Sequence, residues 1–406
     1  MTQLINILDL HQEELAEKIS ILNISKFRSK QIWNWTYSKG AKDFQSMKNI
    51  GNKELPMLTD KFSIERPKVD LDITSLDGTR KWLISFADNK QVEMIFIPET
   101  ERGTICISSQ IGCTLSCKFC HTGTQTLVRN LECFEIVSQI ILAKDLLNDW
   151  DNEQKKITNI VFMGMGEPFF NYDNVAKSIK IITNQEGLGF GLRKITVSTS
   201  GLAPEIIRSA SEIKSNLAIS LHSTNDESRS NIMAINKRYP LVELMKACKY
   251  YNQLNKKQKI TFEYVMLENV NDSTKNALEL VNLIKKFNLH CKVNLIPFNP
   301  WDGCQFSNSN IEAIENFQNR DLIELYDYCE EGEYDLILAS IVSTFSSQVE
   351  SDELPQYILT KKGEEFVREQ AESFFEDDRD VKIDIIPEQA LPYSWKALSE
   401  KKKSIN

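Results

Sequence analysis

The residues that decide the fold stand at positions 104–120, where the sequence reads TICISSQIGCTLSCKFC. Thr104–Ser108 is a short apolar, β-branched run typical of a buried strand. The turn after it leads to three cysteines with the spacing Cx3Cx2C, namely Cys113, Cys117 and Cys120. In parallel β/α proteins functional side chains gather at the carboxyl ends of strands, so this stretch predicts a β/α unit with chemistry in its loop.

Downstream of this stretch, strand and helix patterns alternate up to Pro300. The expected strands are Thr104–Ser108, Asn159–Met163, Lys194–Ser198, Asn216–Leu221, Ile260–Met266 and Lys292–Ile296. Helical patterns such as Cys133–Leu147 and Leu278–Phe287 lie between them. Six such units predict an α/β fold with parallel strands and right-handed crossovers. Their number fits a partial (β/α)6 barrel better than a closed eightfold one.

The remaining parts of the chain flank this barrel, which we place at residues 104–301. Residues 1–70 predict an N-terminal helical accessory domain, with helical periodicity over Leu4–Ile24. In that domain Lys26–Trp35 mixes basic and aromatic side chains, which suits either an RNA contact or a helix with its tryptophans in the core. Residues 71–103 predict a β-rich connection with a hairpin at Asp77-Gly78.

Residues 302–406 predict an irregular, acidic C-terminal tail, part of which we expect to be disordered. We expect neither a clear strand nor a good helix between Gly303 and Leu354, and an exposed helix over Thr360–Phe375. Between Glu350 and Glu388 there are 13 acidic and five basic side chains. This segment accounts for -8 of the formal net charge of -9, so the rest of the chain gives no argument against an RNA partner.

The composition is that of an ordinary globular protein and excludes several classes. The chain has 406 residues, of which 41% are hydrophobic. No run approaches the roughly 20 apolar residues that span a bilayer, and residues 1–20 are too acidic for a signal peptide. We therefore expect a cytoplasmic protein with no membrane partner. In that compartment the nine cysteines are thiols, metal ligands or catalytic groups.

The three closely spaced cysteines favour an iron–sulfur cluster. Three thiolates can hold three irons of a cubane cluster and leave the fourth iron open to a small chelating ligand. The alternative is a zinc site completed by His121, Cys133 or Cys106, although structural zinc usually joins two pairs of ligands.

Six further motifs accompany these cysteines in a fixed order along the chain. They are Gln91-Val92-Glu93 with Ile97-Pro98-Glu99, Cys106 to Cys113, Met163 to Pro168, Ser198-Thr199-Ser200-Gly201, Ser220-Leu221-His222, and Asn294 to Pro300. From about Asp9 to Trp301 this set resembles the RlmN/Cfr family of radical S-adenosylmethionine (SAM) RNA adenine methyltransferases, and in particular its dual-specificity RlmN branch. The spacing of the cysteines is itself the signature of radical SAM enzymes.

The resemblance implies a role for each matching residue. Cys113, Cys117 and Cys120 would ligate a 4Fe-4S cluster whose open iron binds SAM. Glu93 would accept a proton, and Cys106 would resolve a covalent protein–RNA adduct. The implied SAM contacts are Gly166, Glu167, Ser198, Ser220, Leu221, His222 and Asn299. Without the resemblance, Glu93 could face water, Cys106 could pack in the core, and Ser220 and His222 could form hydrogen bonds at strand ends.

The sequence departs from this family near its C-terminus. The family uses a methyl-carrying cysteine in a Cys-Gly-Gln-Leu motif, and this chain contains no such motif. Tyr334 to Val342 stands about where it is expected and lacks the thiol, while Cys329 has a different context and spacing. One hypothesis is a disturbed reading frame after about Arg320. Resequencing that finds an intact frame, and no such motif in an alternative frame, would contradict it.

The resemblance therefore implies an enzyme that methylates C2 of an adenine in 23S rRNA and in tRNA. It would use a 4Fe-4S cluster and SAM, take electrons from a flavodoxin or ferredoxin, and act as a monomer. One alternative is a degenerate family member that cleaves SAM but does not methylate RNA. Another is an RNA-binding protein with a cluster or zinc and no catalysis. Bound iron and sulfide together with 5'-deoxyadenosine formation would exclude the RNA-binding protein without catalysis. Methylated RNA would then distinguish the methylating enzyme from the degenerate family member.

Overall fold

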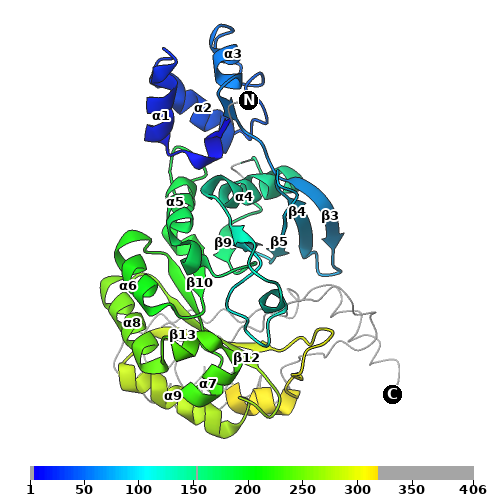
Figure 1. The fold of residues 1–406 in the computed structure, drawn as a ribbon, viewed down its shortest axis with the longest axis vertical. Coiled ribbons are helices and arrows are strands. Elements are labelled where there is room, and N and C mark those ends of the chain that lie inside the picture. The colour runs from blue at the N-terminus through cyan, green and yellow to red at the C-terminus, as the bar shows by residue number, and fades with distance from the viewer. Residues whose placement is uncertain (1–3, 152–153, 319–406) are drawn as a thin grey trace, which may run out of the picture. The chain divides into compact units, whose positions relative to one another are not determined.

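A nine-stranded sheet organises the computed structural model, which describes residues 4–151 and 154–318 (Figure 1). The strand order is β13-β12-β11-β10-β9-β6-β5-β4-β3. The strand bounds are β3 Lys68–Thr74, β4 Arg80–Ser85, β5 Gln91–Pro98, β6 Gly103–Cys106, β9 Asn159–Phe162, β10 Ile195–Thr199, β11 Asn216–Ser220, β12 Ile260–Met266 and β13 Cys291–Pro297.

The six strands from β6 to β13 in this sheet are parallel, and the sequence predicted each of them to within two residues. The helices between them are α4 Cys133–Leu147, α5 Tyr172–Ile182, α6 Ala203–Glu212, α7 Asp226–Ile232, α8 Leu241–Leu254 and α9 Thr274–Phe287. Among the described strands β13 ends the sheet, so the parallel part is open, as a partial barrel requires. The predicted α/β fold class is confirmed.

The antiparallel strands β3, β4 and β5 extend the sheet beyond β6. The predicted hairpin at Asp77-Gly78 is confirmed as the connection between β3 and β4. Gly78 has a φ of +84°, and the Ser75 amide donates to the Thr79 carbonyl at 2.8 Å across this turn. Only glycine adopts such a backbone conformation without strain.

The two faces of the sheet differ in polarity because alternate side chains of a strand point to opposite sides. One face is apolar and lies in the core, with Ile84, Ile105, Ile160, Val197, Ile219 and Phe262 fully buried. The strand registers place a polar set on the opposite face: Glu93, Cys106, Ser198, Ser220, Glu263 and Asn294. The apolar face stabilises the fold, and the polar face is the one available to ligands.

The N-terminal part differs from the single helical run expected over Leu4–Ile24. It begins with β1 Ile5–Asn6 and a 3-10 turn, and α1 Gln12–Ile21 follows. The Asn6 side chain accepts from the Leu8 amide at 3.0 Å, and the Glu14 carboxylate accepts from the His11 amide at 2.7 Å. These two caps interrupt the periodic pattern and fix the first residue of α1.

The basic and aromatic segment forms α2 Phe27–Tyr37, which is followed by α3 Glu54–Thr59 and β2 Phe62–Ser63. Trp33 is buried and packs on Tyr37 with ring centroids 4.4 Å apart. Arg28 and Lys30 form ion pairs with Glu54 and Glu186. These contacts favour the packing interpretation of this segment over an RNA contact.

The segment after Gly303 contains a helix that the sequence interpretation missed, at residues 311–318. The Asn310 side chain accepts from the Ala313 amide at 2.8 Å, and Phe317 is fully buried against Tyr264. This packing on β12 stabilises a helix whose own sequence signal is weak. The predictions for Tyr334 to Val342, Thr360–Phe375 and the acidic tail lie outside the described residues. Within the described part of the chain, no helix is long and apolar enough to cross a bilayer.

Candidate active site

The three cysteines lie on a loop between β7 Gln110–Ile111 and β8 Arg129–Asn130, which pair with each other in antiparallel fashion. At the start of this cysteine loop Gly112 has a φ of +78°, and a Cβ there would lie 2.2 Å from the Thr126 carbonyl oxygen. A Cβ on Gly123 would lie 2.7 Å from the Cys117 carbonyl oxygen. The loop therefore folds tightly on itself, and its two glycines make that close approach possible.

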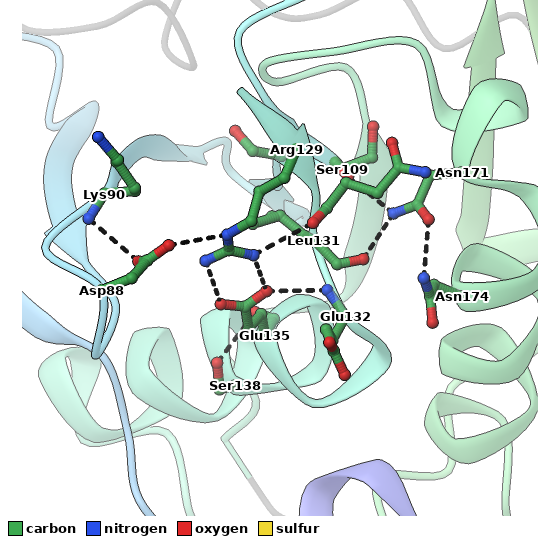
Figure 2. Close-up of polar contacts among 12 residues, drawn as sticks. Asp88, Lys90, Ser109, Arg129, Leu131, Glu132, Glu135, Ser138, Asn171 and Asn174 are labelled. Atoms are coloured by element: carbon green, nitrogen blue, oxygen red, sulfur yellow. Dashed lines mark hydrogen bonds and ion pairs between the residues drawn. The ribbon is translucent and has the colours of Figure 1, made fainter. Parts of the chain in front are cut away.

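A polar network fixes the base of the cysteine loop (Figure 2). The Arg129 guanidinium donates to both carboxylate oxygens of Glu135 on α4, at 2.7 and 2.8 Å, and to Asp88 at 2.8 Å. Nearby, the Asn171 amide donates to the carbonyls of Ser109 and Leu131, at 2.8 and 2.6 Å. The residues next to β7 and β8, at the base of the loop, are thus held by a bidentate ion pair and by a side-chain amide that bridges two carbonyls.

The tip of the cysteine loop is tied to the carboxyl ends of the parallel strands. The Lys118 amide donates to the Ile232 carbonyl of α7 at 3.0 Å. The Phe119 ring packs edge-on against His222, just after β11, with centroids 4.6 Å apart. The Trp301 indole, beyond β13, donates to the Phe119 carbonyl at 3.1 Å. These contacts bring the cysteine loop to the edge where the other predicted site residues lie.

The three thiols match the donor set of a 4Fe-4S cluster. Cys113, Cys117 and Cys120 are each partly exposed and lie within one short loop. Burial raises the pKa of the Cys113 thiol and raises the pKa of Cys117 to about 12. Since iron binds thiolates, cluster assembly must displace these protons. Two residues that could complete a zinc site instead have other surroundings. Cys133 is fully buried at the start of α4, and the His121 ring packs against Trp301.

Gly166 and Glu167 follow β9 and reach across to β7 and β10. Gly166 has a φ of +97°, and a Cβ there would lie 2.4 Å from the Gln110 side chain. The buried Glu167 carboxylate accepts from the Phe169 amide at 3.0 Å and from the Ser200 amide at 2.7 Å. Burial raises the pKa of Glu167, and these amides oppose that change. The carboxylate therefore joins the ends of two strands and retains lone pairs that could accept from a ligand.

The other predicted SAM contacts occupy the ends of β10, β11 and β13. Ser198 and Ser220 lie on the polar face of the sheet, and Asn299 comes two residues after β13. Leu221 is fully buried, and its peptide N–H and C=O bind Glu263 and Arg229. The structure thus gathers these residues along one edge, as the sequence predicted, while Leu221 offers no free peptide group.

His222 forms hydrogen bonds at a strand end, which the sequence analysis gave as the alternative to a SAM contact. Its backbone is left-handed, with a φ of +55°, and its Nδ1 accepts from the Val265 amide at 3.0 Å. Burial, and then the charge of Arg229, lower the pKa of His222 to about 3. The imidazole is therefore neutral, with Nε2 carrying its proton.

Glu93 and Cys106 lie on the same face of the sheet, because Ile95 is paired with Cys106 and Glu93 is two residues before Ile95. The half-exposed Glu93 carboxylate forms an ion pair with Lys81 on β4 at 2.7 Å. Burial raises the pKa of Cys106 to about 12, and the charge of Glu93 adds to that shift. The structure therefore places a carboxylate and a buried thiol on the same face of the sheet.

The sequence interpretation missed two buried polar residues of this region. Glu263 on β12 is next to Ser220 in register, and it accepts from the Asn294 side chain at 2.7 Å. A carboxylate within the apolar run of β12 is a signal that could have identified it. Arg229 on α7 is fully buried below the ends of β10 and β11. Its short helix reads as polar and exposed, so the sequence gives no sign of this burial.

The fold, the cysteine loop and the strand-end residues define a radical SAM protein. Residues 107–281 match the family model described as the radical SAM superfamily. A crystal structure of a radical SAM methyltransferase from Sphaerobacter thermophilus is similar, with a TM-score of 0.75 and 37% sequence identity, covering 79% of this chain and 93% of that one.

Residues 5–64 match the model of the ribosomal RNA large subunit methyltransferase N-terminal domain. The dual-specificity RNA methyltransferase RlmN of Rhodospirillum rubrum is 48% identical over 318 residues, which cover 78% of this chain and 74% of that protein. The RlmN of Rhodopseudomonas palustris strain BisB5 is 46% identical over 327 residues, covering 77% and 82%. The chain belongs to the RlmN family. Its cofactors are a 4Fe-4S cluster and SAM.

Proposed function

We propose that this chain is a radical SAM methyltransferase that methylates C2 of an adenine in 23S rRNA and in tRNA. The observation that carries the proposal is the position of the cysteine loop, where Phe119 contacts His222, just after β11, and Trp301, beyond β13. The dual specificity comes from the relatives, which are named dual-specificity RNA methyltransferases. Such a substrate would present its adenine as an unstacked base over this edge.

We assign the cluster to Cys113, Cys117 and Cys120, and SAM to the adjoining strand ends. When bound, the cluster and SAM supply the radical chemistry that activates an unreactive carbon. The SAM contacts that we propose are Gly166, Glu167, Ser198, Ser220, Leu221, His222 and Asn299. Glu167 is suited to accept from the ammonium group of SAM, because its buried carboxylate lies between the ends of β9 and β10.

Glu93 and Cys106 are the residues that we assign to the RNA substrate. Glu93 forms an ion pair with Lys81, and a carboxylate at this position could take a proton from the target carbon. Cys106 lies on the same face, where its thiol would form a disulfide with the cysteine that holds the RNA adduct, while the carbon–sulfur bond of that adduct breaks and its electron pair goes to the RNA product. Both residues lie on the polar face of the sheet, where Cys106 is buried and Glu93 is half-exposed.

The absence of a Cys-Gly-Gln-Leu motif favours a second candidate function. In this candidate the chain binds the cluster and cleaves SAM but does not methylate RNA. Cys329 and residues 334–342, where the family's methyl-carrying cysteine is expected, lie outside the described residues. The two candidates share the cluster and the SAM site and differ only in the RNA product.

We further propose that the chain acts as a cytoplasmic monomer and takes its electron from a flavodoxin or ferredoxin. The proposed division is an accessory domain at residues 1–70, a connection at 71–103, the radical SAM core at 104–301 and an atypical segment at 302–406. The matches to an N-terminal domain model at residues 5–64 and a radical SAM model at 107–281 support it.

The decisive assay incubates the reconstituted protein with SAM, dithionite and unmodified 23S rRNA or tRNA, and measures 2-methyladenosine by mass spectrometry. We expect methylated adenosine from the wild type and none from Glu93→Gln, which should still form 5'-deoxyadenosine. Glu99→Gln is a matched control, because Glu99 follows the same strand but pairs with Arg102 at the surface. Formation of 5'-deoxyadenosine without methylated RNA would contradict the first candidate and support the second.

A further inference from the structure

Arg229 is a fully buried arginine on α7 that the proposed chemistry does not use. Its Nη2 donates to the carbonyls of Ser200 at 2.7 Å and of Ser220 at 2.8 Å. Its Nε donates to the Leu221 carbonyl at 2.9 Å, and its Nη1 donates to the Asn236 side chain at 2.9 Å. One guanidinium therefore holds the ends of β10 and β11 in a fixed relation.

The positive charge of Arg229 has no anionic acceptor within the described part of the chain. The four acceptors are three carbonyls and an amide oxygen, all of them neutral. Asp226, one helical turn earlier, accepts instead from Asn236 and from the Leu241 amide. Burying a guanidinium without a countercharge is costly, and here burial lowers the pKa of Arg229 to about 10.

A countercharge for Arg229 could come from the cysteine loop. The Lys118 amide binds the Ile232 carbonyl at 3.0 Å, which ties the loop to the helix that carries Arg229. A cluster held by three thiolates would add negative charge on this side of the guanidinium.

The loop after β10 is shaped around the same side chain. Gly201 has a φ of +109°, and a Cβ there would lie 3.3 Å from Arg229 Nη2 and 3.2 Å from Leu244. Ser200, directly before it, binds Glu167 through its amide and Arg229 through its carbonyl. Arg229 is thus connected to Glu167 of the proposed SAM site through a single residue, Ser200.

We propose that Arg229 is a positioning residue that holds the SAM-binding strand ends and provides a fixed positive charge for the cluster. This inference rests on the proposed SAM site. Because the one-electron reduction of the cluster by an external donor adds negative charge, a nearby fixed cation favours the reduced form. Arg229 itself gains and loses neither electron nor proton in this step.

The test measures the reduction potential of the reconstituted protein by anaerobic titration with EPR detection, and the dissociation constant of SAM by equilibrium dialysis. Arg229→Met should make reduction about tenfold less favourable, equivalent to ~59 mV for one electron. Arg229→Lys keeps the charge and loses the guanidinium fork, so its potential should match the wild type while SAM binds about tenfold more weakly. Arg208→Met, which removes an exposed arginine of α6, should change neither quantity.

An unchanged potential in a folded Arg229→Met protein would overturn the role of the charge. If that variant does not fold, Arg229→Lys decides: weaker SAM binding at an unchanged potential supports the proposal, and wild-type values for both overturn it. Circular dichroism of each variant establishes whether it folds. Wild-type protein that bound neither cluster nor SAM would contradict the proposed function itself, whatever the variants showed.

Discussion

Two arginines of this molecule, Arg129 and Arg229, differ in how their charge is neutralised. Arg129 fixes the base of the cysteine loop and meets two carboxylates, Glu135 and Asp88, which raise its pKa above the ordinary value (Figure 2). Arg229 lies at the other end of that loop, and burial among neutral acceptors lowers its pKa to about 10. An arginine whose charge is paired within the protein stabilises the fold, whereas one without such a pair points to the charge of a ligand.

The largest effect should come from removing a ligand of the cluster, whose negative charge we expect to neutralise Arg229. Cys117→Ala should abolish both the cluster and SAM cleavage, because two thiolates cannot replace the three-ligand site. Iron and sulfide analysis and the 5'-deoxyadenosine yield measure this. Cys291→Ala, at the start of β13, is the matched control and should retain both. Retained 5'-deoxyadenosine formation in Cys117→Ala would show that the ligand assignment is wrong.

Removal of the paired arginine should instead lower the stability of the protein without its cofactors. Arg129→Met leaves the nearly buried Glu135 carboxylate without its ion pair, at a cost of about 2–3 kcal/mol. Urea unfolding of the apoprotein measures the change. Arg102→Met removes an exposed ion pair with Glu99 and should cost less than about 0.5 kcal/mol. If both variants lost the same free energy of unfolding, the ion pairs of Arg129 at the base of the loop would be no more stabilising than an ordinary surface ion pair.

Glu263 is the acidic counterpart of Arg229, since it is a buried carboxylate bonded to the neutral Asn294. Burial raises its pKa from 4.5 to about 7. Between these pH values the folded protein binds more protons than the unfolded chain, so stability falls as pH rises from 4.5 to about 7 and then levels off.

Glu263→Gln should remove this pH dependence, which amounts to about 3 kcal/mol. Denaturant midpoints measured from pH 4.5 to 8 test it, and Glu268→Gln, exposed just beyond the same strand, should leave the profile unchanged. An identical slope in Glu263→Gln and the wild type would show that another group titrates.

The smallest effect concerns the space that Gly201 leaves for Arg229. Gly201→Ala forces a side chain into a left-handed conformation next to the guanidinium and should cost about 1–2 kcal/mol. Gly191→Ala is the control, because no atom lies within 4 Å of its Cβ position. Thermal unfolding of the apoproteins compares the two, and a Gly201→Ala protein as stable as the Gly191→Ala protein would contradict this packing argument.

The parallel strands and the cysteine loop could be predicted from the sequence because their signals are local. The β-branched run at β12 has the bounds that its pattern predicts. The spacing of Cys113, Cys117 and Cys120 can be recognised from the sequence alone. The N-terminal helices were predicted, but the helical pattern from Leu4 fails before Gln12, because capping by Asn6 and Glu14 overrides it.

The charge networks could not be predicted, because they join residues that are far apart along the chain. Arg129 forms an ion pair with Asp88, which lies in a different hairpin 41 residues away, and no local sequence pattern predicts this ion pair. The burial of Arg229 depends on the loops of β10 and β11 closing over it, so its helix looks exposed in the sequence alone. The roles assigned to Glu93, Cys106 and the SAM contacts stay predictions.

The measurement that tests the central claim most directly is the yield of 5'-deoxyadenosine from protein reconstituted anaerobically with iron and sulfide, then incubated with SAM and dithionite. We predict about four iron and four sulfide per chain, as a 4Fe-4S cluster requires, and 5'-deoxyadenosine that disappears in Cys117→Ala. Protein that takes up the cluster and binds SAM but forms no 5'-deoxyadenosine would contradict the assignment of radical SAM chemistry to this chain.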